Sequence, residues 1–458
     1  MENNSLVLNV DKKLNIEIEV GENCYIISKE GKKILDLTSN NGKNILGYNN
    51  TQINNEILRY VYNGCLSFPN LFYNKYQEKL ANILCKLAGF YDVENKKLNK
   101  KIDYINFYKN NEFLFNDNFG ENNNYNINYS DNGFENDNKY EGEKIANIKI
   151  NGKVYFCNSS NEANEYAIKI VRKRYNILCE RKYNEIICFN NCFHGETIAN
   201  ISSTKNPLFC YGFEPLLNGF KIAEYNNINS VKSLITEHTS AIMIEPIQTQ
   251  FGIKVADEKF LKKLRELCDY HKIGLIFDET KTCGFKTGRF FSFEHFDTKP
   301  DIITVSDDIS NGFPFGACIV SEEFSKFCKN NNFTTNANIF SLTSSISFIK
   351  YGFDNEIYKK TVIIGKILKN AIIDIAINNK GIIKNVIHFG TILHIKIYDY
   401  INAKKLAEII LKNGLFCLPL ENNYISFCPQ IIISEQDIMN AKKIIDISIK
   451  QVKILEGY

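Results

Sequence analysis

The feature that most constrains the fold is an alternation of short apolar segments with helix-like runs between about residues 153 and 305. Strands are predicted at residues 153–157, 185–189, 241–245, 274–278 and 302–305, and helices at residues 162–175 and 257–271. Short apolar strands that alternate with helices favour parallel pairing through crossover connections. The sequence therefore predicts an α/β protein with a mostly parallel, doubly wound sheet.

The two ends of the chain have a different pattern. Residues 16–37 alternate as strands do and break at residues 29–31, which is a hairpin signal, and residues 76–87 have helical spacing. Beyond about residue 324, helices at 359–378 and 402–412 and strands at 392–397 and 424–427 predict a smaller α+β domain. A chain of 458 residues is too long for one compact core. We expect an N-terminal segment (1–65) that joins the small domain, a large domain (66–324) and a C-terminal small domain (325–458).

An Asn-rich stretch interrupts the predicted large domain at about residues 94–147, where Asn runs lie among Asp, Glu, Gly and Tyr. Such a segment cannot bury enough apolar surface to become ordered. It predicts a disordered surface insertion, and a partner-binding tail is the alternative.

Composition excludes several classes of function. The net charge of +3 is too small to indicate nucleic acid or a membrane surface as a partner, and no apolar run approaches the length of a bilayer span. The first eighteen residues mix Glu, Asp and Lys without a cleavage site, so we expect a cytoplasmic protein. The 14 cysteines include no metal-spaced pair, which predicts free thiols and no metal site.

Three short motifs indicate possible chemistry from their own residues, without the rest of the chain. Residues 156–164 form a strand, a polar turn and a helix start, which suits an anion such as phosphate or simple N-capping by Ser160 or Asn161. Asp278 ends a predicted buried strand, where ligands bind in parallel sheets, although an ion pair capping the next element is the alternative. Phe193 offers an aromatic face, and His194 is either a site residue or a structural histidine.

Eleven short motifs along the chain indicate more together than any of them does alone. They lie at residues 42–48, 70–73, 158–165, 193–195, 212–216, 244–248, 264–268, 276–279, 287–288, 300–302 and 312–317. In this order and spacing they resemble class III, pyridoxal-phosphate-dependent aminotransferases, most closely the acetylornithine and ornithine aminotransferases. The resemblance covers about residues 16–92 and 150–455. It implies the type I fold of pyridoxal-phosphate enzymes, with a large, mostly parallel domain, a smaller α+β domain and a dimer.

The resemblance also implies a set of site residues. The positions that hold pyridoxal 5'-phosphate in the family are here Ser159, Ser160, Asn161, Phe193, His194, Glu245, Asp278, Thr280, Lys281 and Ile339. The substrate positions are Phe72, Tyr73, Gln250 and Ser426. In such a site an Asp at position 278 keeps the pyridine nitrogen protonated, which makes the ring an electron sink.

The departures from the family lie mainly at the positions that bind the cofactor and the substrate. Asp307 stands where the family has its Schiff-base lysine, and a carboxylate cannot form an imine. Thr280 and Lys281 replace a Val and a Gln beside the ring, and Ile339 replaces a Thr that reaches the phosphate. Ser160-Asn161 replaces a phosphate-binding Gly-Ala. At the substrate positions, Gln250 and Ser426 replace a Glu and an Arg that pair with each other; losing one alone would strand a charge at a cost of ~3 kcal/mol.

Two functions are compatible with these departures. One is a catalytically impaired paralogue, a pseudoenzyme that acts through residual ligand binding or dimerisation and holds the cofactor without a covalent bond or not at all. The other is a divergent active aminotransferase that uses a relocated amine, for which Lys281 is the candidate. A scaffold without a ligand is a third possibility. We expect a homodimer or a heterodimer with a lysine-bearing aminotransferase, and we expect Lys281 to pair with Asp307.

Overall fold

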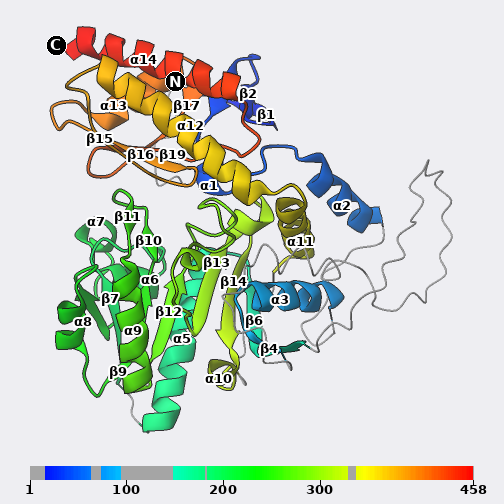
Figure 1. Cartoon of the computed structure of the whole chain (residues 1–458), viewed down its shortest axis with the longest axis vertical. Coiled ribbons are helices and arrows are strands. Elements are labelled where there is room, and N and C mark those ends of the chain that lie inside the picture. The colour runs from blue at the N-terminus through cyan, green and yellow to red at the C-terminus, as the bar shows by residue number, and fades with distance from the viewer. Residues whose placement is uncertain (1–15, 63–73, 94–147, 181–182, 329–336, 457–458) are drawn as a thin grey trace.

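The computed structural model describes residues 16–62, 74–93, 148–180, 183–328 and 337–456 (Figure 1). The Asn-rich stretch at residues 94–147 lies outside the described residues, as do Phe72 and Tyr73. Two flanking strands, β4 (Tyr91–Val93) and β5 (Ile148–Ile150), pair antiparallel and bring the two ends of that stretch together. The predicted disorder of the stretch and its effect on stability therefore stay predictions.

A seven-stranded sheet forms the centre of the lower half of Figure 1. Its order is β6 (Gly152–Cys157), β14 (Gly316–Ser321), β13 (Ile302–Ser306), β12 (Gly274–Asp278), β9 (Thr239–Ile244), β7 (Glu185–Phe189) and β8 (Phe220–Ala223). Strands β8, β7, β9, β12 and β13 are parallel to one another. Strand β14, which the sequence did not predict, runs antiparallel to β13 and β6. The predicted mostly parallel sheet is confirmed.

Helices cover both faces of this sheet because successive side chains of its strands point to opposite sides. Leu275 and Phe277 of β12 belong to one core cluster with Leu264 of α9 (Glu258–His271). Ile276, between them, belongs to another with Ile170 of α5 (Ser160–Cys179). The result is a three-layer α/β/α arrangement, as a doubly wound fold requires.

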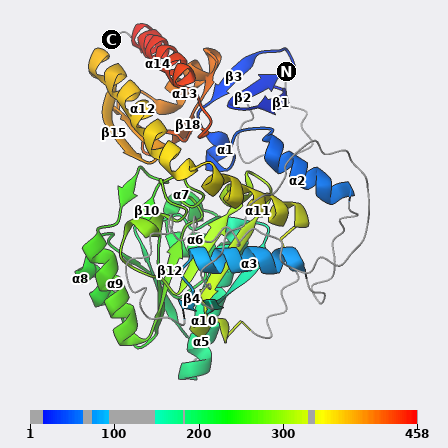
Figure 2. The same cartoon turned by 45° about the vertical axis from the view of Figure 1, so that its right-hand side comes forward.

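The other helices of this half are shorter or lie at its upper edge. They are α3 (Lys75–Leu87), α6 (Ile198–Thr204), α7 (Pro207–Cys210), α8 (Ile228–Leu234), α10 (Glu322–Ser325) and α11 (Ile339–Asp354). The short elements that border the site are α1 (Ser39–Gly42), β10 (Ile247–Gln248), β11 (Lys254–Val255), and the 3-10 helices η3 (Ser292–His295) and η4 (Asp307–Ser310). Figures 1 and 2 place α2 (Thr51–Tyr62) beside α11.

The C-terminal part forms a second, smaller sheet with helices. The antiparallel strands β15 (Ile383–Phe389), β16 (Ile392–Ile397), β19 (Tyr424–Phe427) and β18 (Leu418–Leu420) pair in that order. The long helices α12 (Ile357–Asn378), α13 (Ala403–Lys412) and α14 (Glu435–Glu456) lie with them in the upper part of Figure 1. This is the α+β organisation that the sequence predicts.

The N-terminal strands join this C-terminal part. Strands β1 (Ile18–Glu22), β2 (Tyr25–Ser28) and β3 (Lys33–Asp36) form a sheet with β17 (Leu415–Phe416), which is parallel to β3 (Figure 2). The predicted turn at residues 29–31 is present, with Gly31 at φ 78°, but a second turn at Asn23 makes three strands instead of a hairpin. Domain boundaries at residues 65 and 324 stay predictions.

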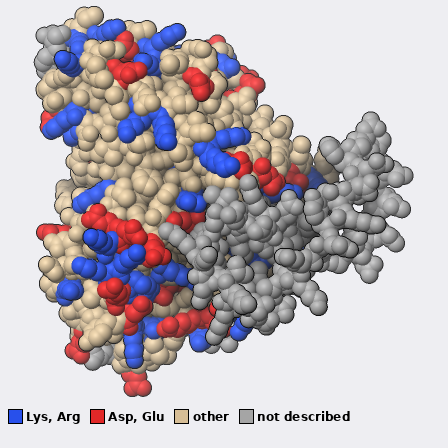
Figure 3. All heavy atoms as spheres, in the orientation of Figure 1, with Lys and Arg blue, Asp and Glu red and all other residues tan. Residues whose placement is uncertain are grey.

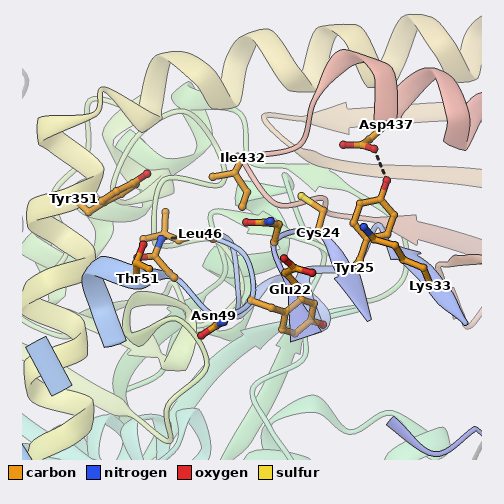
Figure 4. Close-up of a pocket in the computed structure, with 13 residues that line it drawn as sticks. Glu22, Cys24, Tyr25, Lys33, Leu46, Asn49, Thr51, Tyr351, Ile432 and Asp437 are labelled. Carbon is orange, nitrogen blue, oxygen red and sulfur yellow. Dashed lines mark hydrogen bonds between the residues drawn. The ribbon is translucent and has the colours of Figure 1, made fainter. Parts of the chain in front are cut away.

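A cavity of about 440 Å³ lies where the N-terminal strands meet α11 and α14 (Figure 4). The hydroxyl of Tyr25 donates a hydrogen bond to Asp437 at its rim, and Lys33 Nζ lies 4.2 Å from the centre of the Tyr25 ring. None of the predicted site residues lines this cavity. It is therefore separate from the chemistry that the motifs predict.

The surface in Figure 3 carries charges of both signs, which gather over α9. Lys262 pairs there with Glu258 and Asp297, and Arg265 pairs with Asp269 and Asp301. Mixed pairs of this kind make no field of one sign on this face. In the part of the chain that is described, no helix combines the length and the apolar character needed to cross a membrane.

Candidate functional site

The site begins where parallel strands end. Strand β12 ends at Asp278, β9 is followed by Glu245, and β13 is followed by Asp307. The carboxyl ends of parallel strands lie at one edge of the sheet, where α/β proteins bind ligands. Three acidic side chains predicted from separate motifs thus emerge at the same edge.

Asp278 is a buried anion held by five donors, of which the most distant is the hydroxyl of Thr304, at 3.4 Å from Oδ1. Its Oδ2 lies 2.6 Å from His194 Nδ1 and 2.9 Å from Asn164 Nδ2, and its Oδ1 accepts from the backbone and the hydroxyl of Thr280 at 2.9 and 2.6 Å. Burial raises the pKa of Asp278, but the hydrogen bonds from His194 and Thr280 outweigh it and leave that pKa below its ordinary value. The carboxylate is therefore charged, as a partner of a pyridinium nitrogen must be.

Asn164 is a site residue that was not predicted from the sequence. Its amide nitrogen donates both to Asp278 and, at 2.7 Å, to the carbonyl oxygen of His194. It thereby links helix α5 to strand β12 and to the loop that carries His194. Its place within the motif at residues 158–165 was the available signal.

Phe193, Glu245 and Lys281 lie together on one side of Asp278. Glu245 Oε2 accepts the backbone N–H of Phe193 at 3.1 Å, and burial, with Asp278 nearby, raises the pKa of Glu245 to about 8. Lys281 Nζ lies 5.6 Å from the centre of the Phe193 ring, which is within the range of a cation–π contact. The ammonium therefore lies against the aromatic side chain that was expected to stack on a pyridine ring.

The start of helix α5 is capped by its own side chains. The hydroxyl of Ser159 accepts the backbone N–H of Glu162 at 3.2 Å, and Glu162 in turn accepts the backbone N–H of Asn158 at 2.9 Å. Asn161 Oδ1 accepts the N–H of Glu196 at 2.9 Å and lies close to Gly195, where a Cβ would come within 2.0 Å of it. Ser160 and Asn161 occupy the first turn of a long helix, whose free N–H groups suit an anion.

Asp307 pairs with Lys43, and this corrects the expected pairing with Lys281. Lys43 Nζ lies 2.9 Å from Asp307 Oδ2, with the two side chains 38% and 18% exposed. Asp307 begins the 3-10 helix η4, whereas Lys43 follows α1 in the N-terminal part of the chain. Local sequence could not reveal this pair, because the two residues meet only through the packing of two distant segments.

A second acid–base pair lies deeper. Lys286 and Asp308 form an ion pair in which both side chains are almost fully buried, 2% and 4% exposed. Burial lowers the pKa of Lys286, but Asp308 more than compensates, so the ammonium stays charged. Neither residue was predicted from the sequence. The sequence signal for this pair was the two adjacent acids, Asp307 and Asp308, after a buried strand, because each carboxylate needs a cation nearby.

A small cavity of about 40 Å³ joins several of the predicted residues. Gln250 and Ser426, predicted at the substrate positions, line it together with Lys281 and Lys286. The remaining lining residues are Asn41, Gly42, Thr249, Ile392, His394, Leu420 and Cys428. Ile339 is elsewhere, at the first position of α11, whose N-cap Asn338 donates its N–H to Asn158 Oδ1 at 3.3 Å.

These residues fit one side of a pyridoxal cofactor and not the other. Asp278 is the buried anion that a pyridine nitrogen needs, and Ser160 and Asn161 lie at a helix N-terminus that suits phosphate. In contrast, Asp307, which the resemblance places where the family has its Schiff-base lysine, is a carboxylate bound to Lys43, and the ammonium of Lys281 lies against Phe193. With Asp307 at that expected position, the residue there supplies no amine for the covalent attachment through which the family works.

Comparisons with known proteins identify the family. The profile of the family described as Aminotransferase class-III matches residues 126–449. The acetylornithine aminotransferase of Methanocaldococcus jannaschii is 34% identical over 299 residues, which cover 65% of this chain and 74% of that protein. The succinylornithine transaminase of Salmonella paratyphi A is 37% identical over 182 residues, or 40% of this chain and 45% of that protein.

Solved structures share the fold. The ornithine aminotransferase from Toxoplasma gondii superposes with a TM-score of 0.78 at 19% identity, over 97% of this chain and 93% of that one. An aminotransferase of Bacillus anthracis superposes with a TM-score of 0.77 at 19% identity, over 97% and 96%. At this level of identity the likeness concerns the fold, and it confirms the predicted type I architecture.

Proposed function

Because this chain belongs to the class III aminotransferase family, we propose that it is a catalytically impaired member related to the acetylornithine and ornithine aminotransferases. It acts through residual ligand binding in the cleft at Asp278 or through dimerisation, and not through transamination. Pyridoxal phosphate, where it binds, is held without a covalent bond.

The proposal is supported by Asp307, which the resemblance places at the position of the catalytic lysine, and by the ion pair that holds it. In the family that lysine provides both the imine and the proton transfer. A carboxylate provides no amine, and Lys43 already holds Asp307 at 2.9 Å. A general acid–base group typically contributes about 10²–10⁴-fold to the rate, so its loss alone leaves little activity.

Titration with pyridoxal phosphate tests the proposal. We expect no visible band of a protonated internal aldimine, no product trapped by borohydride, and no transamination of acetylornithine or ornithine. An aldimine band that borohydride converts into a stable adduct would overturn it.

A pair of variants provides the control. Asp307→Lys alone places a second cation beside Lys43, so we expect it to form an aldimine poorly. Asp307→Lys combined with Lys43→Met removes that repulsion and should form more. If both variants remain inert, Asp307 is not the sole reason for the lost attachment.

A second candidate function is an active aminotransferase that uses Lys281. Within the described chain, no hydrogen-bond or ion-pair partner of the Lys281 ammonium is found, and burial lowers its pKa, which favours the nucleophilic free amine. Borohydride treatment in the presence of pyridoxal phosphate, followed by peptide mapping, distinguishes the two functions. An adduct on Lys281 that Lys281→Gln abolishes would establish the second.

Dimerisation is part of the proposal. We expect a homodimer, or a heterodimer with a lysine-bearing aminotransferase that supplies the catalytic amine. Sedimentation at micromolar concentration distinguishes a dimer from a monomer, and co-purification identifies a second type of subunit. A monomer that recovers no such subunit would contradict both forms.

A further inference from the structure

The cavity of about 440 Å³ beside the N-terminal strands has walls of two kinds (Figure 4). Its volume is within the range of about 300–1,000 Å³ that is typical of small-molecule sites. Leu46, Ile432 and Tyr351 provide apolar and aromatic surface, whereas Glu22 and Lys33 carry opposite charges. Figure 4 shows Leu46 and Tyr351 on the left of the cavity and Lys33 on the right. A ligand that matches both walls has an apolar part and charges of both signs.

The side chains of the charged wall lie on one face of the N-terminal sheet. Glu22 on β1 is directly opposite Tyr25 on β2, so their side chains are neighbours on the same face. Lys33 on β3 is opposite Ile27, which is two residues beyond Tyr25 and therefore on that face as well. The Lys33 ammonium accordingly lies 4.2 Å from the centre of the Tyr25 ring. Glu22 and Lys33 thus approach Tyr25 from two different strands.

These two charges are unpaired, whereas the third charge of the wall is not. Asp437 accepts hydrogen bonds from the hydroxyl of Tyr25 and, at 2.6 Å, from that of Ser434. Burial raises the pKa of Asp437, but these hydrogen bonds outweigh it and leave that pKa below its ordinary value. Glu22 and Lys33 have no ion-pair partner among the residues that the structure describes, and they do not pair with each other. Both side chains are exposed, so a ligand can reach them from solvent.

The polar middle of the cavity is held in place by the backbone. The N–H of Asn23 donates to the carbonyl oxygen of Tyr48 at 3.1 Å, and the N–H of Tyr48 donates to that of Asn23 at 2.8 Å. The side chains of Asn49 and Thr51 line the cavity beside this pair and supply an amide and a hydroxyl. The cavity is therefore formed before a ligand arrives, which lowers the cost of binding.

We propose that this cavity binds a free α-amino acid with an apolar or aromatic side chain. The ammonium group of the amino acid pairs with Glu22, its carboxylate pairs with Lys33, and its side chain packs against Leu46 and Ile432. A zwitterion satisfies both unpaired charges, whereas a simple cation would be repelled by Lys33 and a simple anion by Glu22. The inference goes beyond the proposed function and does not depend on it, because none of these residues belongs to the cleft at Asp278.

L-Phenylalanine and two derivatives test the inference on the full chain. N-acetylphenylalanine lacks the ammonium charge, and phenylalaninamide lacks the carboxylate charge. Ligand-observed NMR should detect phenylalanine, and each derivative should bind about fivefold more weakly, which is the upper range for a partly exposed ion pair. Glu22→Gln should weaken phenylalanine binding about fivefold and leave N-acetylphenylalanine binding unchanged. Lys33→Met should have the same effects on phenylalanine and on phenylalaninamide.

Glu19→Gln and Lys32→Met are the matched controls, because both residues are exposed, lie close to the altered ones in sequence and do not line the cavity. They should leave phenylalanine binding unchanged. Absence of phenylalanine binding, or equal binding of all three ligands to the wild type, would overturn the inference. Undiminished phenylalanine binding by both cavity variants would also overturn it, because the amino acid would then bind elsewhere, such as in the cleft. The aldimine band tests the proposed function separately.

Discussion

The cleft has a pyridine side around Asp278 and a lysine side around Asp307 and Asp308. The two sides differ in how their charges are held. On the pyridine side, Asp278 is buried and accepts five hydrogen bonds, from His194, Asn164, Thr280 and Thr304. On the lysine side, the charges of η4 are neutralised by two lysines from other segments, Lys43 and Lys286. The first arrangement is a hydrogen-bond network within the large sheet, whereas the second is a set of ion pairs between segments.

This difference predicts how each side tolerates substitution. A change at Asp278 strands several buried donors at once, so no single substitution is tolerated there. On the lysine side an acid and its basic partner can be substituted together, because each charge in a pair needs only one partner of opposite sign. Of the expected departures, Thr280 adds two donors to the network around Asp278, whereas Asp307 falls in an ion pair on the lysine side.

The sharpest test of the comparison is Asp278→Asn, for which we expect the largest effect. The amide cannot accept from all five donors, and His194 loses its buried counterion, so the variant should lose about 3–5 kcal/mol of unfolding free energy. Urea denaturation measures this loss. A loss no larger than that of Asp307→Asn would remove the distinction between the two sides.

The buried pair Lys286–Asp308 should be the more sensitive of the two pairs on the lysine side. We expect Lys286→Met or Asp308→Leu alone to cost about 3 kcal/mol, because each leaves one charge buried without its partner. The double variant should come within about 1 kcal/mol of the wild type, since no lone charge remains. Additive losses in denaturant titrations would show that the two charges act independently.

Glu245 should make stability depend on pH. Its pKa rises from an ordinary 4.5 to about 8 on folding, so between these values the folded chain holds a proton that the unfolded chain has released. Stability therefore falls as pH rises through this window, by about 1.4 kcal/mol per pH unit for one such group. Glu245→Gln should reduce that slope in thermal denaturation.

Glu294 is the matched control for this pH dependence. It has a pKa of about 8 for the same reason, burial, but it caps η3 outside the cleft, where it accepts the N–H of Phe291 at 2.8 Å. Glu294→Gln should reduce the slope to a similar degree. If only one of the two variants changes the slope, the other carboxyl is already ionised in the folded chain.

The smallest effect is expected at Lys43–Asp307. This pair is partly exposed, so a double-mutant cycle with Lys43→Met and Asp307→Asn should give a coupling of about 0.2–1 kcal/mol that decreases with added salt. A coupling near that of the buried pair would show that the site excludes water more completely than the exposed fractions indicate.

Much of the fold could be predicted from the chain because the pattern is local. The strands Gly274–Asp278, Ile392–Ile397 and Tyr424–Phe427 lie where the apolar runs predicted them. Two helices begin one residue later than predicted, because Asp257 and Asn402 are N-caps with extended backbones. The direction of β14 could not be predicted, since an apolar strand has the same local sequence in either orientation.

The α/β architecture and the family could be predicted from the sequence, since both depend on residue identity and on spacing along the chain, and the same spacing leads us to expect Asp307 in place of the catalytic lysine. Only the tertiary structure decided the partners of the charged side chains. Lys43 meets Asp307 and Lys286 meets Asp308 because distant segments pack together, and Lys281 is left beside a small cavity. Electrostatic pairing acts over a few ångströms in space, and the order of residues in the chain does not record that proximity.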